Sequence, residues 1–302
     1  MSKMDYQPLT EANFKAVHEL FSRNEKFYSI PLDYFRRGTF EDENFDPDLT
    51  LVLTDSNTNK TIGALIAVNR ADFCCMKALI IDKEFRRQGI GKKMLKEIIN
   101  RAKAKNENIN YINFGASPPN YWLTGVDVRH TDLLFFLKKN RFKLIETRQN
   151  LTVPLENLDL KPLSEKKGYY YERVQPEDFD ELLEFVRDNY GHSSWPEEVQ
   201  MSLKVTPPPT FVAKNKDGKI IGWATHGLQF PGAFGPTGVL YTIQGKGIGS
   251  ELLKWCLWDI KQSGLETCTI MWVVGNTIKF YSKSIGAYIS PVFYQMTKKL
   301  RR

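Results

Sequence analysis

Residues 86–95 read RRQGIGKKML and residues 244–253 read QGKGIGSELL, so one glycine-containing segment occurs twice in the chain. With Gly89 aligned on Gly247 and Gly91 on Gly249, the two copies lie 158 residues apart. The residues that follow each copy repeat as well: both place apolar side chains at i, i+1, i+4, i+5 and i+8, which form one stripe of a helix. The repeat therefore indicates an internal duplication in which a glycine loop precedes a helix.

The elements expected around the two loops follow one order, namely a helix, a hairpin, a strand, the glycine loop with its helix, and then strand, helix and strand. In the first half the hairpin covers residues 49–68, and the strand before the loop covers 73–81. In the second half the hairpin covers 210–225, and the strand before the loop covers 238–241. This layout predicts an α/β fold in which helices flank a mixed, mostly antiparallel sheet.

The length of 302 residues suits two domains of about 150 residues each. The segment between the halves is charged, contains Pro162 and lacks periodicity, which is typical of a linker. We therefore expect an N-terminal domain over 1–155, a linker over 156–168 and a C-terminal domain over 169–302.

Composition predicts a globular protein without a membrane segment, because 42% of residues are hydrophobic, 25% are charged, and no apolar run approaches bilayer length. Residues 1–6 form no apolar targeting segment, so we expect a cytosolic protein. The charge of +7 is spread evenly, with 24 Lys and Arg against 21 Asp and Glu in residues 1–160 and 18 against 14 in 161–302, so no nucleic-acid partner is expected. The four cysteines show no metal-binding spacing, which predicts buried, reduced thiols and no metal.

A glycine loop between a strand and a helix can direct several backbone N–H groups at one anion, and the helix dipole adds positive potential there. A cluster of cations surrounds the first loop, from Lys83 to Lys96, which is either an ordinary solvated helix face or an attraction for phosphate. The nucleotide-binding motif GxxxxGK[ST] is absent, and Ser250 stands where the dinucleotide motif GxGxxG needs its third glycine.

Both loops match [Q/R]-x-x-G-x-[G/A], beginning at Arg86 and at Gln244, and here the chain resembles the GNAT superfamily of acyl-CoA-dependent N-acetyltransferases. In that family this segment cradles the pyrophosphate of acetyl-CoA, so the resemblance implies acetyl-CoA as co-substrate and two tandem GNAT-like domains. The residues that it implies for binding come from the loop and from the strand before it. They are Ile81, Arg86, Arg87, Gln88, Gly89, Ile90, Gly91 and Lys92 in the first copy, and Val239, Gln244, Gly245, Lys246, Gly247, Ile248, Gly249 and Ser250 in the second.

The resemblance also implies that an amine attacks the thioester, that a backbone N–H on the strand before the loop polarises its carbonyl, and that a tyrosine protonates the thiolate. Tyr281 matches that tyrosine, although one extra residue stands between it and Gly286, and a packing role is the alternative. In the first half Leu137 falls at the tyrosine position, and leucine cannot give a proton. On this ground we favour the C-terminal half for the chemistry.

Four residues are considered as a general base: Asp82, Glu84, Asp127 and His226. Each is more simply explained as a surface or structural residue. The insertion over 117–127 contains two prolines and two aromatic residues, and loops of this kind line sites or seal domain contacts.

We thus expect an N-acetyltransferase that acts on a primary amine of a small molecule or peptide, as a monomer or homodimer. The alternative is a non-catalytic acyl-CoA-binding or scaffold protein with one or both domains degenerate, prompted by Leu137 and the register at Tyr281. A third interpretation, an aminoacyl transferase that uses charged tRNA, is disfavoured by the even charge.

Overall fold

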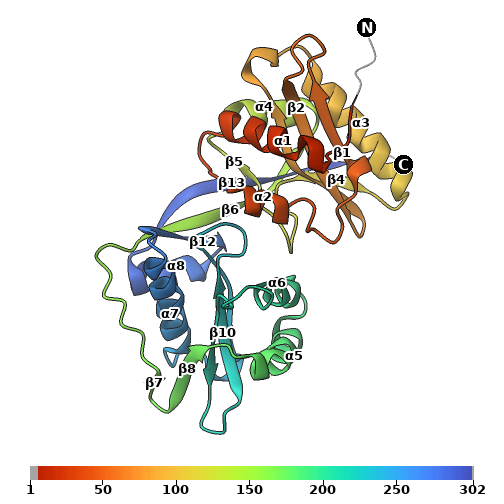
Figure 1. The fold of residues 1–302 in the computed structure, drawn as a ribbon. Helices are drawn as coiled ribbons and strands as arrows, with labels where there is room; N and C mark the ends of the chain where they lie inside the picture. Colours follow the sequence, from red (N-terminus) through yellow and green to blue (C-terminus); the bar gives the residue numbers. More distant parts are fainter. Residues whose placement is uncertain (1–5, 301–302) are drawn as a thin grey trace. The chain divides into compact units, whose positions relative to one another are not determined.

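The computed structural model describes residues 6–300 and divides into two compact units (Figure 1). Unit 1 comprises residues 1–148 and 293–302, and unit 2 comprises residues 149–292. Each unit contains one glycine loop between a strand and a helix, as the repeat predicts.

In unit 1 the strands run in the order β1-β2-β3-β4-β13, with β5 also paired to β13. All of these pairs are antiparallel except β3 with β4, which is parallel. The elements are α1 (Glu11–Asn24), α2 (Leu32–Arg37), the short 3₁₀ helix η1 (Pro47–Leu49), β1 (Thr50–Thr54), β2 (Thr61–Arg70), β3 (Phe73–Ile81), η2 (Lys83–Phe85), α3 (Ile90–Lys105), β4 (Tyr111–Phe114), β5 (Val126–Asp127) and α4 (Thr131–Lys139), followed by β6 (Lys143–Pro154).

In unit 2 the strands run in the order β6-β12-β11-β10-β9-β8-β7, again antiparallel except for one pair, β11 with β12. The elements are β7 (Glu165–Lys166), β8 (Tyr169–Arg173), η3 (Pro176–Asp178), α5 (Phe179–Tyr190), α6 (Trp195–Ser202), β9 (Thr210–Lys214), β10 (Ile220–His226), β11 (Ala233–Val239), η4 (Tyr241–Ile243), α7 (Ile248–Gln262), β12 (Thr267–Val273), α8 (Asn276–Ile285) and β13 (Tyr288–Lys299). The predicted fold class is confirmed in both units.

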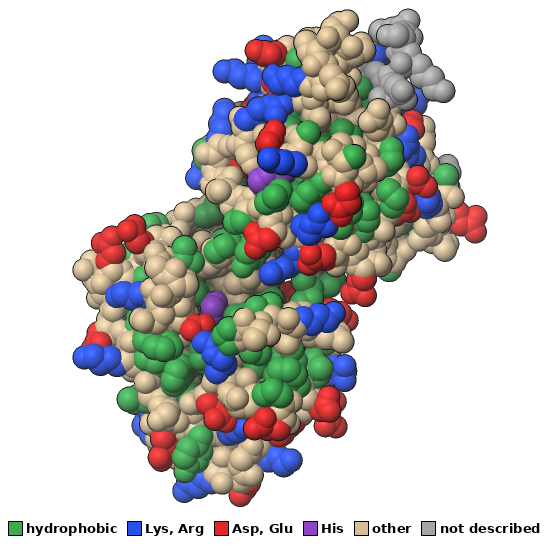
Figure 2. All heavy atoms as spheres, in the orientation of Figure 1, with side chains coloured by type: hydrophobic (Ala, Val, Ile, Leu, Met, Phe, Trp, Pro, Cys, Tyr) green, Lys and Arg blue, Asp and Glu red, His purple; other side chains and the backbone are tan. Residues whose placement is uncertain are grey.

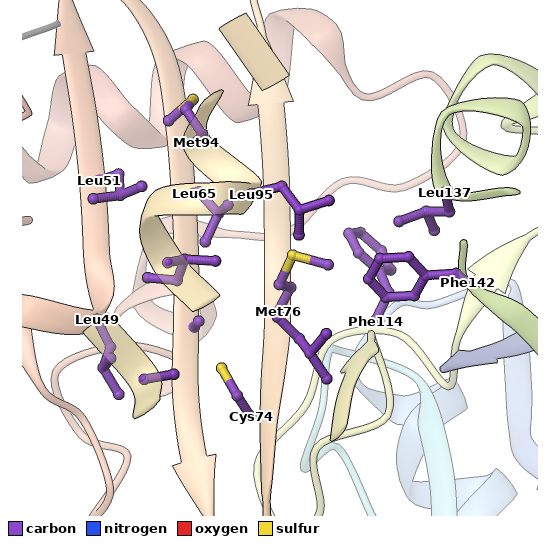
Figure 3. Packing of buried hydrophobic residues seen from close by; sticks show 14 of the residues in the cluster. Leu49, Leu51, Leu65, Cys74, Met76, Met94, Leu95, Phe114, Leu137 and Phe142 are labelled. Carbon is purple, nitrogen blue, oxygen red and sulfur yellow. The ribbon is translucent and has the colours of Figure 1, made fainter. Parts of the chain in front are cut away.

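Helices cover both faces of the sheet in each unit, because the strands carry apolar side chains on both faces. In unit 1, α1 and α2 bury Phe14 and Phe35 against one face, while α3 and α4 cover the other. Figure 3 shows the core on the face covered by α3 and α4, where Met94 and Leu95 of α3 lie over Leu65 and neighbouring strand residues. In unit 2, α5 and α6 lie on one face of β10, and α7 and α8 lie on the other (Figure 1).

The closing strands cross from one half of the sequence to the other. From Gln149 onward β6 belongs to unit 2, where Leu151 pairs with Ile270 of β12. From Phe293 onward β13 belongs to unit 1, where Met296 pairs with Phe114 of β4. The compact units therefore differ from the contiguous ranges 1–155 and 169–302 expected from the sequence, because an alternating pattern identifies a strand but not its partner.

The segment 156–168, expected as a linker, lies within unit 2. Leu158 and Leu160 pack against the core beneath α7, and the backbone N–H of Leu163 donates to the Glu251 carboxylate at 3.0 Å. It contains β7, so this segment is part of the folded unit.

In each unit the parallel strand pair separates before the first strand of the pair reaches its glycine loop. The β3–β4 pairing ends at Met76 and Phe114, and the β11–β12 pairing ends at Phe234 and Ile270. Beyond these points, no strand within residues 6–300 pairs with the edges of β3 and β11 that lead into the loops. This separation creates the space in which the candidate sites lie.

Candidate functional site

The first glycine loop turns through two left-handed residues, Arg87 at φ 61° and Gly89 at φ 78°, before α3 begins at Ile90. The first turn of a helix leaves its N–H groups without intrahelical partners, so those of α3 are available to an anion. The second loop repeats this geometry, with Gly245 at φ 81° and Gly247 at φ 87° before α7.

The first residue of each motif fastens its loop to the strand before it. Arg86 Nε donates to the carbonyl of Ile81 at 2.9 Å, and Gln244 Nε2 donates to the carbonyl of Val239 at 3.2 Å. Arg86 also donates to Asn24 at the end of α1, at 3.0 Å. This residue therefore sets the position of the loop, and the N–H groups of the loop remain for a ligand.

Unit 1 contains a pocket of about 990 Å³ that begins at the first loop. Of the first-copy residues expected to bind the co-substrate, all but Gln88 line this pocket, and Gln88 is exposed beside it. The opposite wall comes from the end of α1, from the insertion that precedes α4, and from α4 itself. Leu123 and Gly125 of the 117–127 insertion are part of that wall, so the insertion borders the pocket.

The free edge of β3 forms the floor between these walls. Because the N–H of Asp82 bonds Ile62 of β2 at 2.8 Å, the preceding Ile81 turns its own N–H and carbonyl toward the edge that has no strand partner. Its carbonyl accepts from Arg86, and its N–H lies on the same open edge. An N–H in this position can polarise a carbonyl group bound in the pocket.

Lys77 occupies a bulge in β3, where Ala67 pairs with Met76 and Ile66 pairs with Ala78. Its ammonium group is buried, donates to the carbonyl of Gly38 at 2.8 Å and is paired with Asp42. Burial lowers the pKa of Lys77 to about 8, although the Asp42 carboxylate acts in the opposite direction. Lys77 is thus a buried and paired cation in the lining of the pocket.

In unit 2 the corresponding backbone groups are already bonded. Tyr190, the last residue of α5, donates its hydroxyl hydrogen to the carbonyl of Val239 at 2.8 Å and accepts from the N–H of Val239 at 3.1 Å. Its ring packs against Trp223 at 5.0 Å and Tyr241 at 5.5 Å between centroids. The edge of β11 is therefore closed by a side chain of the same unit, although Gln244–Ser250 keep the loop geometry.

Tyr281, expected as the acid, lies in the core of unit 2. Its side chain is 7% exposed and its ring packs edge-on against Phe234, with centroids 6.1 Å apart. Burial raises the pKa of its phenol, and the neighbouring thiols of Cys268 and Cys256 add to the shift. This position favours the packing alternative. Leu137, at the same place in α4 of unit 1, is fully buried.

Three of the four base candidates do not line the pocket. Asp82 pairs with Arg23 at 2.9 Å, His226 Nε2 donates to the Asp259 carboxylate at 2.9 Å, and Glu84 is exposed. Burial alone would raise the pKa of Asp82, but its bonds with Arg23 and Lys60 hold it below the usual value. None of these three groups is therefore placed to act as a base in that pocket.

Asp127 does line the pocket, with its side chain fully buried. It is paired with Arg129 at 2.7 Å and accepts a hydrogen bond from Tyr28. Burial raises its pKa, but the bonds from Arg129 and Tyr28 outweigh this and lower it overall. Asp127 is therefore an ionised group that holds Arg129, whose guanidinium lies 4.1 Å from the centre of the Phe27 ring.

A second pair in the same wall was not identified from the sequence. His130, directly before α4, forms a hydrogen bond through Nε2 with Glu25 at 3.1 Å, and both residues line the pocket. They are 105 residues apart in the chain, so no spacing pattern relates them. The only signal in the sequence is a histidine directly before a helix that follows the glycine-loop helix.

Among residues 6–300, no group of three or more His, Cys, Asp and Glu side chains is placed to hold a metal ion, and all four cysteines are free and buried. No helix of that part is long and apolar enough to cross a bilayer. Acidic and basic side chains are interspersed over the face drawn in Figure 2.

A model of the acetyltransferase (GNAT) family matches the chain twice, over residues 14–122 and 169–287. No curated protein sequence gives a significant match. The chain is similar in fold to the GCN5-related glucosamine N-acetyltransferase region of a fungal multi-domain GH3 β-N-acetylglucosaminidase (TM-score 0.75, 16% identity), covering 99% of this chain but only 38% of that one.

Two further structures match along almost their whole length. One is a GCN5-related N-acetyltransferase from Sphaerobacter thermophilus (TM-score 0.74, 14% identity, 99% of this chain and 96% of that chain). The other is a tandem GNAT protein from the clavulanic acid biosynthesis pathway (TM-score 0.71, 14% identity, 98% of each chain).

Proposed function

Because the chain belongs to the acetyltransferase (GNAT) family, we propose that its unit 1 transfers an acetyl group from acetyl-CoA to a primary amine of a small molecule or peptide. The family in general transfers acyl groups from acyl-CoA to amines. The choice of acetyl-CoA, of a primary amine and of unit 1 belongs to the proposal.

One observation carries the choice of unit 1: the glycine loop and the free edge of β3 open into the same large pocket. The loop offers helix N-terminal N–H groups to a pyrophosphate, and Arg87 and Lys92 add positive charge beside it. Ile81 offers its N–H to the thioester carbonyl, where negative charge develops as the amine attacks.

Unit 2 is assigned no acetyl transfer in this proposal, because Tyr190 bonds both polar groups of Val239. The buried position of Tyr281 supports the same assignment. The sequence favours the C-terminal half on account of Tyr281, and the proposal departs from it for these two reasons. In this proposal Gln244–Ser250 keep a structural role only, as the loop that leads into α7.

The proposal includes a cytosolic location, supported by four unpaired, buried cysteines, which are typical of a reducing compartment. A tRNA-dependent transfer is not favoured, because Lys and Arg are mixed with Asp and Glu over the face in Figure 2.

The test is CoA release from acetyl-CoA, followed as free thiol, with polyamines, aminoglycosides, amino sugars, amino acids and peptide N-termini as acceptors. We expect at least one of these amines to stimulate release from the wild type, and Arg86→Ala to abolish most of that rate. Longer acyl-CoAs measured in parallel define the acyl chain that the pocket takes. If acetyl-CoA binds tightly in calorimetry and no amine stimulates release, the non-catalytic alternative is correct.

A further inference from the structure

We infer that His130 is the catalytic base of unit 1, that Glu25 is its positioning residue, and that the acceptor amine binds beside them; this rests on the proposed function. The inference starts from a geometric fact: the two side chains form a bonded pair in the wall of the pocket that holds the glycine loop. In this pair the carboxylate of Glu25 holds the imidazole of His130. An imidazole held by a carboxylate is the usual arrangement of a general base in acyl transfer.

The carboxylate of this pair is held in place by its own contacts. Glu25 directly follows α1, and its Oε1 accepts the backbone N–H of Phe27 at 2.8 Å as well as the His130 ring nitrogen at 3.1 Å. Its side chain is 10% exposed. Burial raises the pKa of Glu25, but the bonds with His130 and Phe27 more than compensate and lower it. Glu25 is therefore a carboxylate when His130 is neutral.

A carboxylate acceptor determines which ring nitrogen carries the proton. Because Glu25 can only accept, neutral His130 donates through Nε2–H, and its lone pair is left on Nδ1. His130 is the N-cap of α4 but makes no side-chain cap hydrogen bond, so Nδ1 is not used by the helix. The Phe27 ring, 5.0 Å from the imidazole, limits its rotation. Within residues 6–300, no hydrogen bond engages Nδ1, so the basic nitrogen is left for a ligand.

The surrounding charges suit this role. Arg129 lies next to His130 in the chain but is bonded to the buried Asp127, and Asp132 of α4 is a partner of Arg86. From the end of α1, Glu25 faces the ring, and Lys26 also lines the pocket. An imidazolium formed during the reaction is stabilised by Glu25 at 3.1 Å.

The proton balance is as follows. The neutral amine nitrogen attacks the thioester carbon, an N–C bond forms, and His130 Nδ1 takes the proton that the nitrogen loses. As the C–S bond breaks, the same imidazolium gives this proton to the departing thiolate, so the products are an amide and a free thiol. His130 then also supplies the proton that Leu137, at the usual tyrosine position, cannot supply.

The experiment compares wild type with His130→Gln, Glu25→Gln and the control His192→Gln, an exposed histidine of unit 2. The acceptor is the amine that gives the fastest CoA release from the panel above, and kcat and kcat/KM are measured between pH 5.5 and 9. We expect His130→Gln to lower kcat by roughly 10²–10⁴-fold and to remove one ionisation from the profile. Glu25→Gln should lower kcat roughly 10–100-fold and move that ionisation to a different pH in the profile.

Calorimetry with acetyl-CoA separates chemistry from folding and binding, because all three variants should bind it with the wild-type Kd. The inference is overturned if His130→Gln keeps kcat within twofold and keeps every ionisation of the profile. A wild type that no amine stimulates overturns the proposed function itself, and the inference with it. Equal losses in His192→Gln would also overturn it, since that residue lies outside unit 1.

Discussion

The hydroxyl of Tyr190 contacts both polar backbone groups of Val239, donating to the carbonyl at 2.8 Å and accepting from the N–H at 3.1 Å. The matching residue of the first half, Ile81, bonds through its carbonyl to Arg86 and lines an open pocket. The two halves therefore share a loop geometry, but the strand residue before the loop is bonded by a tyrosine hydroxyl only in the second half. That difference predicts one acetyl-CoA site per chain.

Two measurements test this relationship: the number of acetyl-CoA molecules bound per chain and the stability of unit 2. Tyr190→Phe removes the hydroxyl and leaves the half-buried Val239 N–H without its partner, which should cost about 1–3 kcal/mol of unfolding free energy. Because the ring still fills the space beside Gly238, calorimetry should give one bound acetyl-CoA for the variant as for the wild type. Tyr241→Phe is the control, since Tyr241 is 59% exposed. Two acetyl-CoA molecules bound to the wild type would contradict the prediction.

Gly89 and Gly247 form a matched pair for separating backbone strain from ligand binding. Both have positive φ, 78° and 87°, and a Cβ built at either meets no atom within 4 Å. Alanine should therefore cost about 1–2 kcal/mol at each position through its backbone conformation alone. We expect both variants to lose stability in urea unfolding, but only Gly89→Ala to weaken acetyl-CoA binding in calorimetry. Equal loss of affinity in the two variants would mean that both loops bind.

The glycine loops, the helices after them and the order of elements could be predicted because each depends on local spacing in the sequence. The exchange of β6 and β13 could not, because the pattern of a strand does not specify its partner. Tyr281 matches a family position, yet only the fold places its ring against Phe234. Glu25 and His130 come together through the ends of α1 and α4, and no local pattern encodes that contact.

Arg86 combines an anchoring role with a charge, and these can be separated by substitution. Arg86→Gln recreates the residue type of the second loop, which still donates to the strand carbonyl, as Gln244 does at 3.2 Å. It removes the charge and the bond to Asn24 at 3.0 Å. We expect a folded protein whose Kd for acetyl-CoA is about tenfold higher, a change of about 1.4 kcal/mol. The same titration with Gln244→Ala should give the wild-type Kd, and a weaker Kd there would count against unit 1 as the binding unit.

Glu198 gives unit 2 a pH dependence of known sign. Its carboxyl is buried, accepts from the Ser194 hydroxyl at 2.7 Å and from Gln229 at 3.3 Å, and burial raises its pKa to about 7. The folded state therefore binds this proton more tightly than the unfolded state, where glutamate has a pKa of about 4.3. Stability is greatest below the unfolded pKa and falls as pH rises, by about 1.4 kcal/mol per pH unit from this group, until the folded pKa is passed.

Glu198→Gln keeps the shape and the hydrogen bonding of the protonated acid without its titration. We expect urea unfolding between pH 4 and 8 to show the wild type losing stability relative to this variant, with the two nearly equal near pH 4 and the variant more stable at pH 8. Glu197→Gln is the control, because Glu197 is the exposed neighbour in the same helix. A wild type and Glu198→Gln that respond to pH in parallel would show that Glu198 ionises in the folded protein as it does in the unfolded chain.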